Sequence, residues 1–501
     1  MRDNIVVLSA ALVAGSTLPW AYSPYDYPVL AIFSLTALFW FWHDVEPNVA
    51  AAIGFIFGLG MFGCGVWWIQ ISIHQFGLPI YAFSAAVTAV FVLVLCCFPA
   101  FCGYLAARLP AGNEFLRIVC LYPAAWAATE MLRGWVFTGF PWLLVGYSQI
   151  DSPLSVFAPV IGVYGVGYIT ALVAAAIVVL LRTQRRWRTS ALAVLISIVI
   201  AVLALHNVRW THVVGDPISV ALIQGGIPQS VKWNPAYRKP SIDLYMKLSD
   251  PHWGKSMIIW PETAIPAFAD EVGETLTALT DRALESGTSL LVGMPSGERT
   301  GRNGYFNSVV QLGLESGRYD KRHLVPFGEY LPLNKWIRPL TTFLQIPMSD
   351  FSPGGYEQPL MSVNNHAIGV TICYEDAYAN EVARALPDAR VLVNVSNDAW
   401  FGDSDAPHQH LQIARMRALE TERYLLRGTN TGISAIIDDR GKVLTASKQF
   451  VSDVVSGEVV PRSGSTPAAR YGATATISFC LILLVICGLS RFYRTDNSEH
   501  S

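Results

Sequence analysis

Charged residues are scarce in this sequence. Lys, Arg, Asp and Glu make up 14% of its 501 residues, whereas a soluble protein of this length usually contains about 25%. The shortage is uneven, because the first lysine is Lys232 and long apolar runs fill the chain before it. From about 215 to 460, by contrast, charged residues of both signs occur throughout. The sequence therefore excludes a fully soluble protein and predicts a membrane protein with one large soluble domain.

Cysteine is nearly absent from the predicted soluble domain. Seven of the eight cysteines lie in apolar segments, where cysteine behaves as a small hydrophobic residue. Cys373 is alone in the soluble part, so a disulfide within that domain is excluded. Clustered metal ligands are missing too, since His408 and His410 stand two apart and do not share a helix face. We expect no metal and no cofactor, and the net charge of −2 gives no indication of nucleic-acid binding.

Eight apolar segments approach the roughly 20 residues that a membrane-spanning helix needs. They cover residues 5–22, 27–43, 50–73, 83–107, 116–134, 157–181, 190–206 and 473–490. The first segment has features of a signal peptide, but the second follows it too closely for that interpretation. We predict a membrane domain with seven helices at 1–212, a soluble domain at 213–465, and a final helix with a short tail at 466–501.

Arginine clusters predict the orientation in the membrane, because positive charge favours the cytoplasmic side. The clusters are Arg2, Arg108 with Arg117, residues 182–188, and Arg491 with Arg494. With eight crossings, all four clusters fall on one side. Both termini would then lie in the cytoplasm, and the soluble domain would lie outside it. In a bacterium with two membranes, this predicts an inner-membrane protein whose soluble domain is in the periplasm.

One charged pair lies inside a predicted span. Glu130 and Arg133 stand near the outer end of the fifth apolar segment. Charged groups at membrane depth usually pair with each other, contact backbone carbonyls or face a polar pathway. This pair would either anchor the outer end of the helix or help to receive a lipid headgroup, and the sequence favours neither.

The soluble part alternates apolar strands with helices. Strands are predicted at 218–225, 256–262, 289–295, 307–313, 367–375, 389–396 and 432–439. Helices are predicted between them, at 272–286 and 407–426 among others. Such alternation is typical of a layered α/β domain.

Reactive side chains follow three of these predicted strands. Glu262 ends MIIWPE, Lys321 and then Glu329 follow a predicted hairpin, and Cys373 ends GVTIC. A carboxylate can take the proton of a thiol, and a fixed ammonium can stabilise the oxyanion of a tetrahedral intermediate. Glu, Lys and Cys therefore suffice for acyl transfer through a thioester. The ordinary alternative is that the cysteine only packs and the glutamates are solvated, which is the commoner role of both residue types.

Four motifs, in this order, resemble the nitrilase, or carbon–nitrogen hydrolase, superfamily. They are WPETAIP, DKRHLVPFGEYLP, ICYED and NVSNDAWFG. The resemblance implies an α-β-β-α sandwich with a Glu-Lys-Cys triad. A domain of this kind between the seventh and eighth of eight spans is similar to the apolipoprotein N-acyltransferase family. RGWVFTGFPW (133–142), QGGIPQSVKW (224–233) and the stretch at 414–438 also fit that family, so the match covers nearly the whole chain.

The resemblance also implies a reaction. Members of the family take an acyl chain from a phospholipid, typically phosphatidylethanolamine, onto the cysteine. They then transfer it to the α-amino group of the diacylglyceryl-cysteine that begins an apolipoprotein. On this basis Cys373 is the nucleophile, Glu262 the general base and Lys321 the group that stabilises the oxyanion. The implied partners are the phospholipid donor, the apolipoprotein acceptor and the membrane, and we expect a monomer.

The same resemblance suggests supporting residues. Glu329 would position Lys321 and help with the proton of the incoming amine, and Tyr374 would give its backbone N–H to the oxyanion. Glu375 would either brace the turn at the cysteine or bind the headgroup. Trp233 lies in a family motif, where it would contact substrate or fill the core.

A broken apolar segment at 337–355 suggests a route for lipid. Its prolines and glycines disfavour a long helix or a central strand. One interpretation is an ordinary loop over its own core. The other is an apolar flap, carrying Phe343, Leu344 and Phe351, through which acyl chains reach the thiol from the bilayer.

Two further functions fit parts of the pattern. A membrane-anchored amidase of the nitrilase type would use the same triad with water as the acceptor, but a single span would suffice to anchor it. A transporter or assembly protein with a degenerate domain would need neither Glu262, Lys321 nor Cys373. The intact triad and the eight spans favour the acyltransferase.

Overall fold

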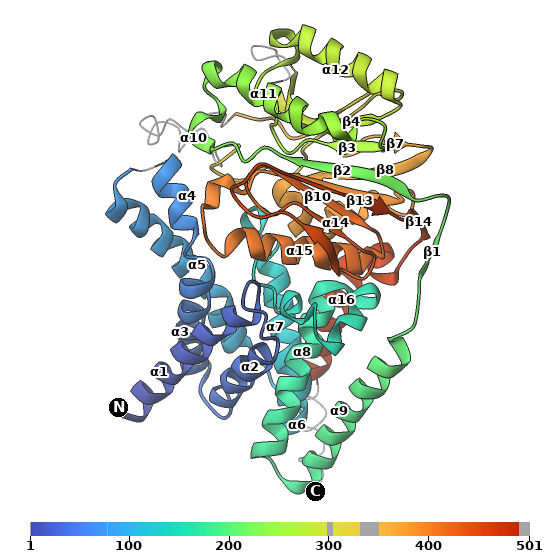
Figure 1. The fold of residues 1–501 in the computed structure, drawn as a ribbon. Coiled ribbons are helices and arrows are strands. Elements are labelled where there is room, and N and C mark those ends of the chain that lie inside the picture. Colours follow the sequence, from blue (N-terminus) through green and yellow to red (C-terminus); the bar gives the residue numbers. More distant parts are fainter. Residues whose placement is uncertain (1, 78, 298–303, 331–349, 490–501) are drawn as a thin grey trace, which may run out of the picture. The chain divides into compact units, whose positions relative to one another are not determined.

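A computed structural model describes residues 2–77, 79–297, 304–330 and 350–489 (Figure 1). The chain divides into two compact units. The first holds residues 1–70, 81–209 and 471–501, and the second holds residues 71–80 and 210–470. The first unit is helical, whereas the second contains the sheets.

The first unit consists of apolar helices. These are α1 (Arg2–Thr17), α2 (Val29–Phe41), α3 (Pro47–Gly65), α5 (Tyr81–Arg108), α6 (Glu114–Leu116), α7 (Tyr122–Arg133), α8 (Ala158–Arg182), α9 (Arg185–Leu205) and most of α16 (Pro467–Leu489). Among the described residues, six helical segments are long and apolar enough to cross a membrane, and two more, Ile5–Ala21 and Val29–Phe41, are apolar but shorter. All eight predicted segments therefore coincide with apolar helices.

The third predicted segment, 50–73, differs from the structure. Helix α3 already ends at Gly65, and a separate helix, α4 (Ile69–Phe76), follows it. From Ile71 onward this part of the chain belongs to the second unit. The break lies at residues 66–68, and the helix after it carries polar side chains, among them His74 and Gln75, that are uncommon in a continuous span.

Helices of the first unit pack closely through small residues. A Cβ at Gly15 of α1 would collide with the carbonyl of Phe57 in α3, and a Cβ at Gly54 of α3 would collide with the carbonyl of Pro99 in α5. Only glycine permits such backbone contact, which is how helices associate where lipid removes the hydrophobic driving force.

Glu130 and Arg133 brace the loop that follows α7. Glu130 Oε1 accepts a hydrogen bond of 2.9 Å from the N–H of Val145, and Arg133 donates to the carbonyls of Phe140 and Trp142. Both charged side chains are at least 96% buried. Their partners are backbone groups of the loop, so these contacts favour the anchoring role over headgroup binding.

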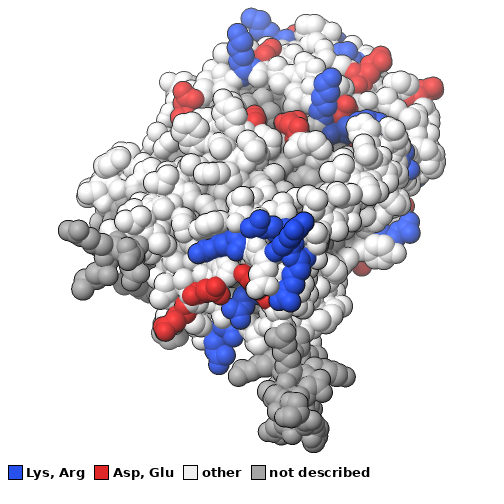
Figure 2. Space-filling model, turned by 90° about the horizontal axis from the view of Figure 1, so that it is seen from below, with Lys and Arg blue, Asp and Glu red and all other residues white. Residues whose placement is uncertain are grey.

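Charged side chains gather at one end of the first unit. Figure 2 shows one group of basic and acidic residues surrounded by uncharged surface, with further charged residues elsewhere in the same view. His43 pairs with Asp44 and with Glu114 at 2.9 and 2.8 Å, and Arg182 stacks over the ring of Trp40 at 4.5 Å. The turns after α2, α5 and α8 therefore meet at this end, which also carries the predicted arginine clusters at 108–117 and 182–188.

The described part of the second unit contains two six-stranded sheets (Figure 1). The first has the order β13-β2-β3-β4-β5-β6 and the second the order β12-β11-β10-β9-β8-β7. The first sheet has three central parallel strands, which are β2 (Ile218–Gln224), β3 (Met257–Ile259) and β4 (Ser289–Gly297). Its other strands are antiparallel to their neighbours, and these are β5 (Tyr305–Leu312), β6 (Gly317–Asp320) and β13 (Asp453–Val459). The second sheet also has three central parallel strands, which are β8 (His366–Ile372), β9 (Val391–Ser396) and β10 (Leu425–Thr429). Its antiparallel strands are β7 (Met361–Val363), β11 (Ala435–Ile437) and β12 (Val443–Ala446). The short strands β1 (Thr211–Val213) and β14 (Arg462–Gly464) pair separately.

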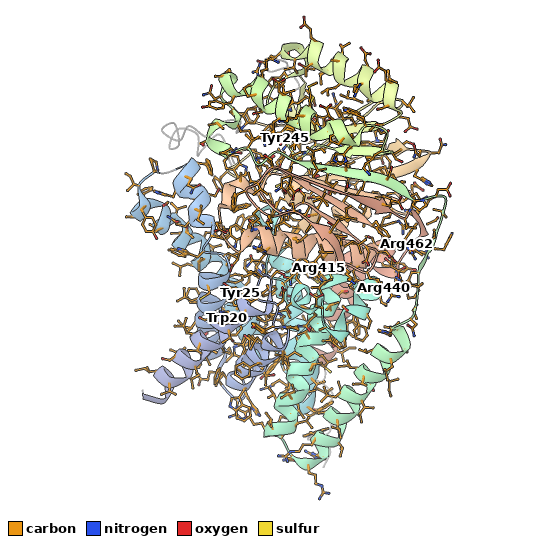
Figure 3. The ribbon with its side chains drawn as sticks, in the orientation of Figure 1. Trp20, Tyr25, Tyr245, Arg415, Arg440 and Arg462 are labelled. Carbon is orange, nitrogen blue, oxygen red and sulfur yellow. The ribbon has the colours of Figure 1, made fainter. Side chains whose placement is uncertain are left out.

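The two sheets share one apolar core, and helices cover their outer faces. Leu222 and Ile259 of the first sheet and Ile372 and Val393 of the second belong to the same buried cluster. Outside the first sheet lie α11 (Pro235–Ser249) and α12 (Gly273–Ser286). Tyr245 of α11, which is labelled in Figure 3, stacks on the ring of Trp260 at 5.1 Å. Outside the second sheet lie α14 (Ala379–Ala383) and α15 (Ala406–Thr421). This arrangement confirms the predicted α-β-β-α sandwich.

All seven predicted strands are present, but the predicted helix at 407–426 is too long. Helix α15 ends at Thr421, because Glu422 turns into the left-handed region with φ of 46°. The side chain of Glu422 holds this turn by accepting hydrogen bonds from the N–H groups of Trp210 and Thr211. The chain then forms β10, a central strand that the sequence pattern did not separate from the helix.

Candidate active site

Cys373 lies at a sharp turn directly after β8. It begins a short 3₁₀ helix, Cys373–Ala377, and its φ of 54° lies in the left-handed region that non-glycine residues seldom adopt. The carbonyl of Cys373 accepts a hydrogen bond from Asn394 Nδ2 of β9 at 3.1 Å. Burial and the nearby Glu262 raise the pKa of the thiol above its ordinary value, although Lys321 opposes this. The thiol therefore needs a base before it can act as a nucleophile.

Glu262 follows β3 and is 7% exposed. Its Oε1 accepts a hydrogen bond of 2.7 Å from Asn307 Nδ2 and lies 3.7 Å from Lys321 Nζ. Within the described residues, its Oε2 accepts no hydrogen bond, so one carboxylate oxygen remains able to take a proton. A Cβ at Gly293 of β4 would collide with this turn, so glycine is required there.

Lys321 follows β6 and is 1% exposed. Its Nζ donates to both carboxylate oxygens of Glu329, at 2.9 and 2.8 Å. Burial lowers the pKa of the ammonium, but the charges of Glu329 and Glu262 more than offset this effect and raise the pKa above its ordinary value. Lys321 is therefore a fixed cation at neutral pH.

Asn307 links the two glutamates and was missed by the sequence analysis. It lies on β5, is 3% exposed, and its Nδ2 also donates to Glu329 Oε1 at 2.8 Å. An amide with two N–H donors can bridge two carboxylates in this way. The only signal was a polar residue opening the predicted strand at 307–313. We call Glu262, Asn307, Lys321 and Glu329 the lysine cluster.

Glu375 joins the turn at Cys373 to the segment after Lys321. Its side chain is fully buried and accepts four hydrogen bonds of 2.7 to 3.1 Å. The donors are the backbone N–H groups of Arg322, His323 and Ile372 and the hydroxyl of Tyr319. Burial raises the pKa of the carboxyl group, although these hydrogen bonds oppose that effect. With all four bonds made inside the domain, the geometry favours bracing over headgroup binding.

Lys232 is a second buried lysine beside the site, and the sequence analysis missed it. It ends α10 (Gln229–Lys232), is 3% exposed, and its Nζ donates to the backbone carbonyl of Glu262 at 2.9 Å. Burial lowers the pKa of its ammonium to about 8, although Glu262 and Cys373 raise it. Its position inside the motif QGGIPQSVKW, next to Trp233, was the available signal.

The remaining predicted site residues lie around this centre. Tyr374 is partly exposed, and its ring lies 5.1 Å from that of Tyr378. Trp233 is partly buried directly after α10. Phe351 is 9% exposed, with its ring 4.8 Å from that of Tyr305 on β5. Phe343 and Leu344, the other residues of the predicted flap, lie outside the described residues.

A second group of buried charges lies behind the turn at Cys373, and we call it the arginine cluster. It consists of Asp376, Asp398, His410 and Arg427, each at most 2% exposed. His410 bridges the two aspartates at 2.9 Å each, and Arg427 contacts both at 3.2 and 2.9 Å. Burial and Arg427 lower the pKa of His410, but the two aspartates outweigh them and raise it to about 9.

The two histidines of the HQH sequence therefore have separate partners. His410 contacts the aspartates, whereas His408 Nε2 hydrogen-bonds with Gln449 at 2.9 Å. Across the described ranges, no group of three or more His, Cys, Asp or Glu side chains has the arrangement of a metal site.

Comparisons with known proteins identify the family of the chain. Residues 14–176 match the profile of the apolipoprotein N-acyltransferase N-terminal domain, and residues 219–468 match the carbon–nitrogen hydrolase profile. An apolipoprotein N-acyltransferase from Methylococcus capsulatus is 43% identical over 491 residues, covering 98% of this chain and 97% of that protein. One from Pseudomonas aeruginosa is 38% identical over 489 residues, covering 97% and 96%.

Among solved structures, the carbon–nitrogen hydrolase of Helicobacter pylori G27 matches 53% of this chain and 92% of its own, with 14% identity and a TM-score of 0.36. The relatives cover both units at well above 30% identity, and the triad residues stand in the matched hydrolase region. The chain therefore belongs to the apolipoprotein N-acyltransferase family, with a carbon–nitrogen hydrolase domain as its second unit.

Proposed function

We propose that this membrane acyltransferase moves a fatty acyl chain from a phospholipid, through a thioester on Cys373, to the α-amino group of an apolipoprotein. The acceptor amine belongs to an N-terminal diacylglyceryl-cysteine. The observation that carries the proposal is the meeting of three strand ends, which brings Glu262 and Lys321 beside a strained cysteine.

In the first half-reaction, Glu262 takes the proton of the Cys373 thiol. The thiolate attacks the ester carbonyl of the phospholipid, and a C–S bond forms as the carbonyl oxygen becomes an oxyanion. Lys321, held by Glu329, and the backbone N–H of Tyr374 stabilise that oxyanion. When the C–O bond breaks, Glu262 returns the proton to the departing alkoxide, and a lysophospholipid leaves.

In the second half-reaction, the acceptor amine attacks the thioester. Glu262, with Glu329 assisting, removes the proton that the amine must lose, and the same donors hold the second oxyanion. Collapse breaks the C–S bond, and the thiolate regains its proton from Glu262. The product is a triacylated lipoprotein N-terminus.

Three residues support these steps without touching the reacting atoms. Asn307 holds Glu262 and Glu329 in place, Glu375 fixes the turn at Cys373, and Lys232 fixes the carbonyl of Glu262. We assign Trp233 to the wall of the acceptor or donor site, because it follows Lys232 directly.

The donor is proposed to be phosphatidylethanolamine and the protein a monomer. The arginines at the ends of the predicted spans support placement in a bacterial inner membrane, with both termini in the cytoplasm and the hydrolase domain in the periplasm. Division of the chain at 1–212, 213–465 and 466–501 belongs to this proposal. Access of lipid to Cys373 through the predicted flap, which carries Phe343, Leu344 and Phe351, is also part of this proposal.

Intact-mass analysis of the purified protein tests the proposal. Incubation with phosphatidylethanolamine vesicles should add one fatty acyl chain to Cys373, which hydroxylamine removes as it does other thioesters. Cys373→Ala should carry no adduct, whereas replacement of the other seven cysteines together should leave it in place. An adduct that persists in Cys373→Ala would refute the mechanism.

The acceptor separates this proposal from an amidase. A synthetic diacylglyceryl-cysteine peptide should discharge the acyl-enzyme and carry the chain away as an amide. Discharge by water alone, with the peptide unmodified, would favour hydrolysis instead. Similarity over nearly the full length of acyltransferase relatives favours the peptide.

A further inference from the structure

Ser396 occupies the position next to Cys373 on the neighbouring strand. Strands β8 and β9 are parallel, and their last registered pair is Ile372 with Val395. Cys373 and Ser396 are the residues that follow, so they leave adjacent strands at the same level of the sheet. Ser396 is fully buried, and its hydroxyl is one of the groups that act on the Cys373 thiol, whose pKa it lowers against the effect of burial.

The hydroxyl of Ser396 has another acceptor available. Its Oγ donates to Asp398 Oδ1 at 3.0 Å. A serine hydroxyl carries one proton and rotates freely to suit its surroundings. It can therefore donate to the carboxylate of Asp398 or to the sulfur of Cys373, but not to both at once.

Asp398 does not depend on this hydrogen bond. Its Oδ1 also contacts His410 Nδ1 at 2.9 Å, and its Oδ2 accepts from Arg427 Nη2 at 2.9 Å. Both partners belong to the arginine cluster and compensate the charge of Asp398. When the Ser396 hydroxyl turns away, both carboxylate oxygens of Asp398 therefore still have a donor. The rotation of the hydroxyl then costs little free energy.

We propose that Ser396 is a further catalytic residue, whose hydroxyl turns from Asp398 to the Cys373 sulfur when the thiolate forms. The inference rests on the proposed function, because it assumes that Cys373 reacts as a thiolate. Glu262 takes the thiol proton, and the Ser396 proton stays on its own oxygen throughout. The hydroxyl turns back to Asp398 when the C–S bond forms, and it donates again when the thiolate leaves in the second half-reaction.

The charges around Cys373 explain why such a donor is useful. Glu262 and Asp398 are negative and raise the pKa of the thiol, as burial does, whereas Lys321 lowers it. Lys232 is a second ammonium that interacts with Cys373. Because Lys321 is shared with two glutamates, a neutral O–H beside the sulfur adds stabilisation that acts only on the charged thiolate.

The dependence on pH of Cys373 alkylation by iodoacetamide, followed into the alkaline range as far as the domain stays folded, tests this inference. The rate is measured on the full-length protein in detergent, from the mass of the peptide that contains Cys373. A hydrogen bond to a charged group shifts an equilibrium by about ten- to hundredfold. Ser396→Ala should therefore slow alkylation at pH 7.5 at least about tenfold, and the pH midpoint should rise by at least about one unit.

Two further variants separate this role from packing. Ser447→Ala removes another buried hydroxyl of the same domain, which donates to Gln224 at 2.7 Å, and it should leave the pH midpoint unchanged. Ser396→Thr restores the hydroxyl and should return the midpoint toward that of the wild type. Thermal unfolding of each variant shows whether the domain is intact.

An unchanged midpoint in folded Ser396→Ala would overturn the inference, as would an equal shift in Ser447→Ala. If Ser396→Ala does not fold, the pH midpoint of Ser396→Thr decides instead. Threonine keeps the hydroxyl, so the inference expects a midpoint near that of the wild type. A midpoint at least about one unit higher would count against the inference. Failure of the proposed function has a different signature, since Cys373→Ala would then still transfer acyl chains whatever the alkylation profile.

Discussion

The lysine cluster and the arginine cluster are both buried groups of charges, but they are arranged in opposite ways. In the arginine cluster two cations face two carboxylates, and every carboxylate oxygen has a charged partner. In the lysine cluster one cation faces two carboxylates, and Glu262 keeps an oxygen that accepts no hydrogen bond from the described residues. Complete pairing makes a rigid support, whereas incomplete pairing leaves a group able to react.

The largest effect should come from breaking the complete pairing. Arg427→Met leaves Asp376 and Asp398 with His410 as their one charged partner among the described residues, and removing one partner of a buried ion pair costs about 3–5 kcal/mol of stability. We expect a strong fall in the melting temperature in detergent. Arg238→Met, which removes a partly exposed pair with Glu271, should cost no more than about 1 kcal/mol. Similar losses in both variants would contradict the distinction.

Removing the cation of the lysine cluster should instead affect the chemistry. Lys321→Ala loses oxyanion stabilisation worth roughly 3–4 kcal/mol, so formation of the acyl adduct on Cys373 should slow by a hundredfold or more. Lys321→Arg should not restore the rate, because a planar guanidinium cannot replace a compact ammonium between two carboxylates. Intact-mass time courses measure both rates. A wild-type rate in Lys321→Ala would remove the residue from the mechanism.

The bridge between the two glutamates should matter less. Asn307→Ala removes hydrogen bonds to Glu262 and Glu329 without removing a charge, and we expect adduct formation to slow about tenfold. Gln311→Ala is the matched control, because this amide on the same strand donates to the carbonyl of Ser362 instead. Equal slowing in the two variants would mean that β5 itself is disturbed.

The arginine cluster should also make the stability depend on pH. The folded pKa of His410, about 9, lies above its unfolded value of about 6.5. Its protonated form therefore contributes stability that is full below about pH 6.5 and is lost as pH rises through about 9. Melting temperatures of the wild type should fall across this window, and those of His410→Gln should fall less. A steeper fall in His410→Gln would contradict the assignment.

The sequence pointed to the residues that we propose to react, but not to the groups that hold them. Glu262, Lys321 and Cys373 follow predicted strands and lie in long motifs, so their meeting at one edge could be expected. Asn307 and Ser396 lie inside or at the end of strands, and their roles depend on which face and which neighbour each strand acquires.

That information depends on pairing between distant strands and on the meeting of two sheets, neither of which has a local signal. The same limit applied to β10, whose apolar residues continue the pattern of the preceding helix until the conformation of Glu422 separates them. Local sequence patterns thus predicted where helices and strands lie. Which side chains contact each other was decided by tertiary contacts.

Membership of residues 71–80 in the second unit has a practical consequence. The ring of Phe76 in α4 lies 4.7 Å from that of Trp400, and a Cβ at Gly402 would lie 3.4 Å from Ile71. The hydrolase domain is therefore discontinuous in sequence, and a fragment cut at Trp210 and Arg470 would lack part of its own surface. Such a fragment would expose Trp400 to water and invite aggregation. Supplying residues 71–80 on a linker would restore the contact with Trp400. The folding unit of the domain therefore includes residues 71–80 as well as the continuous segment from Trp210 to Arg470.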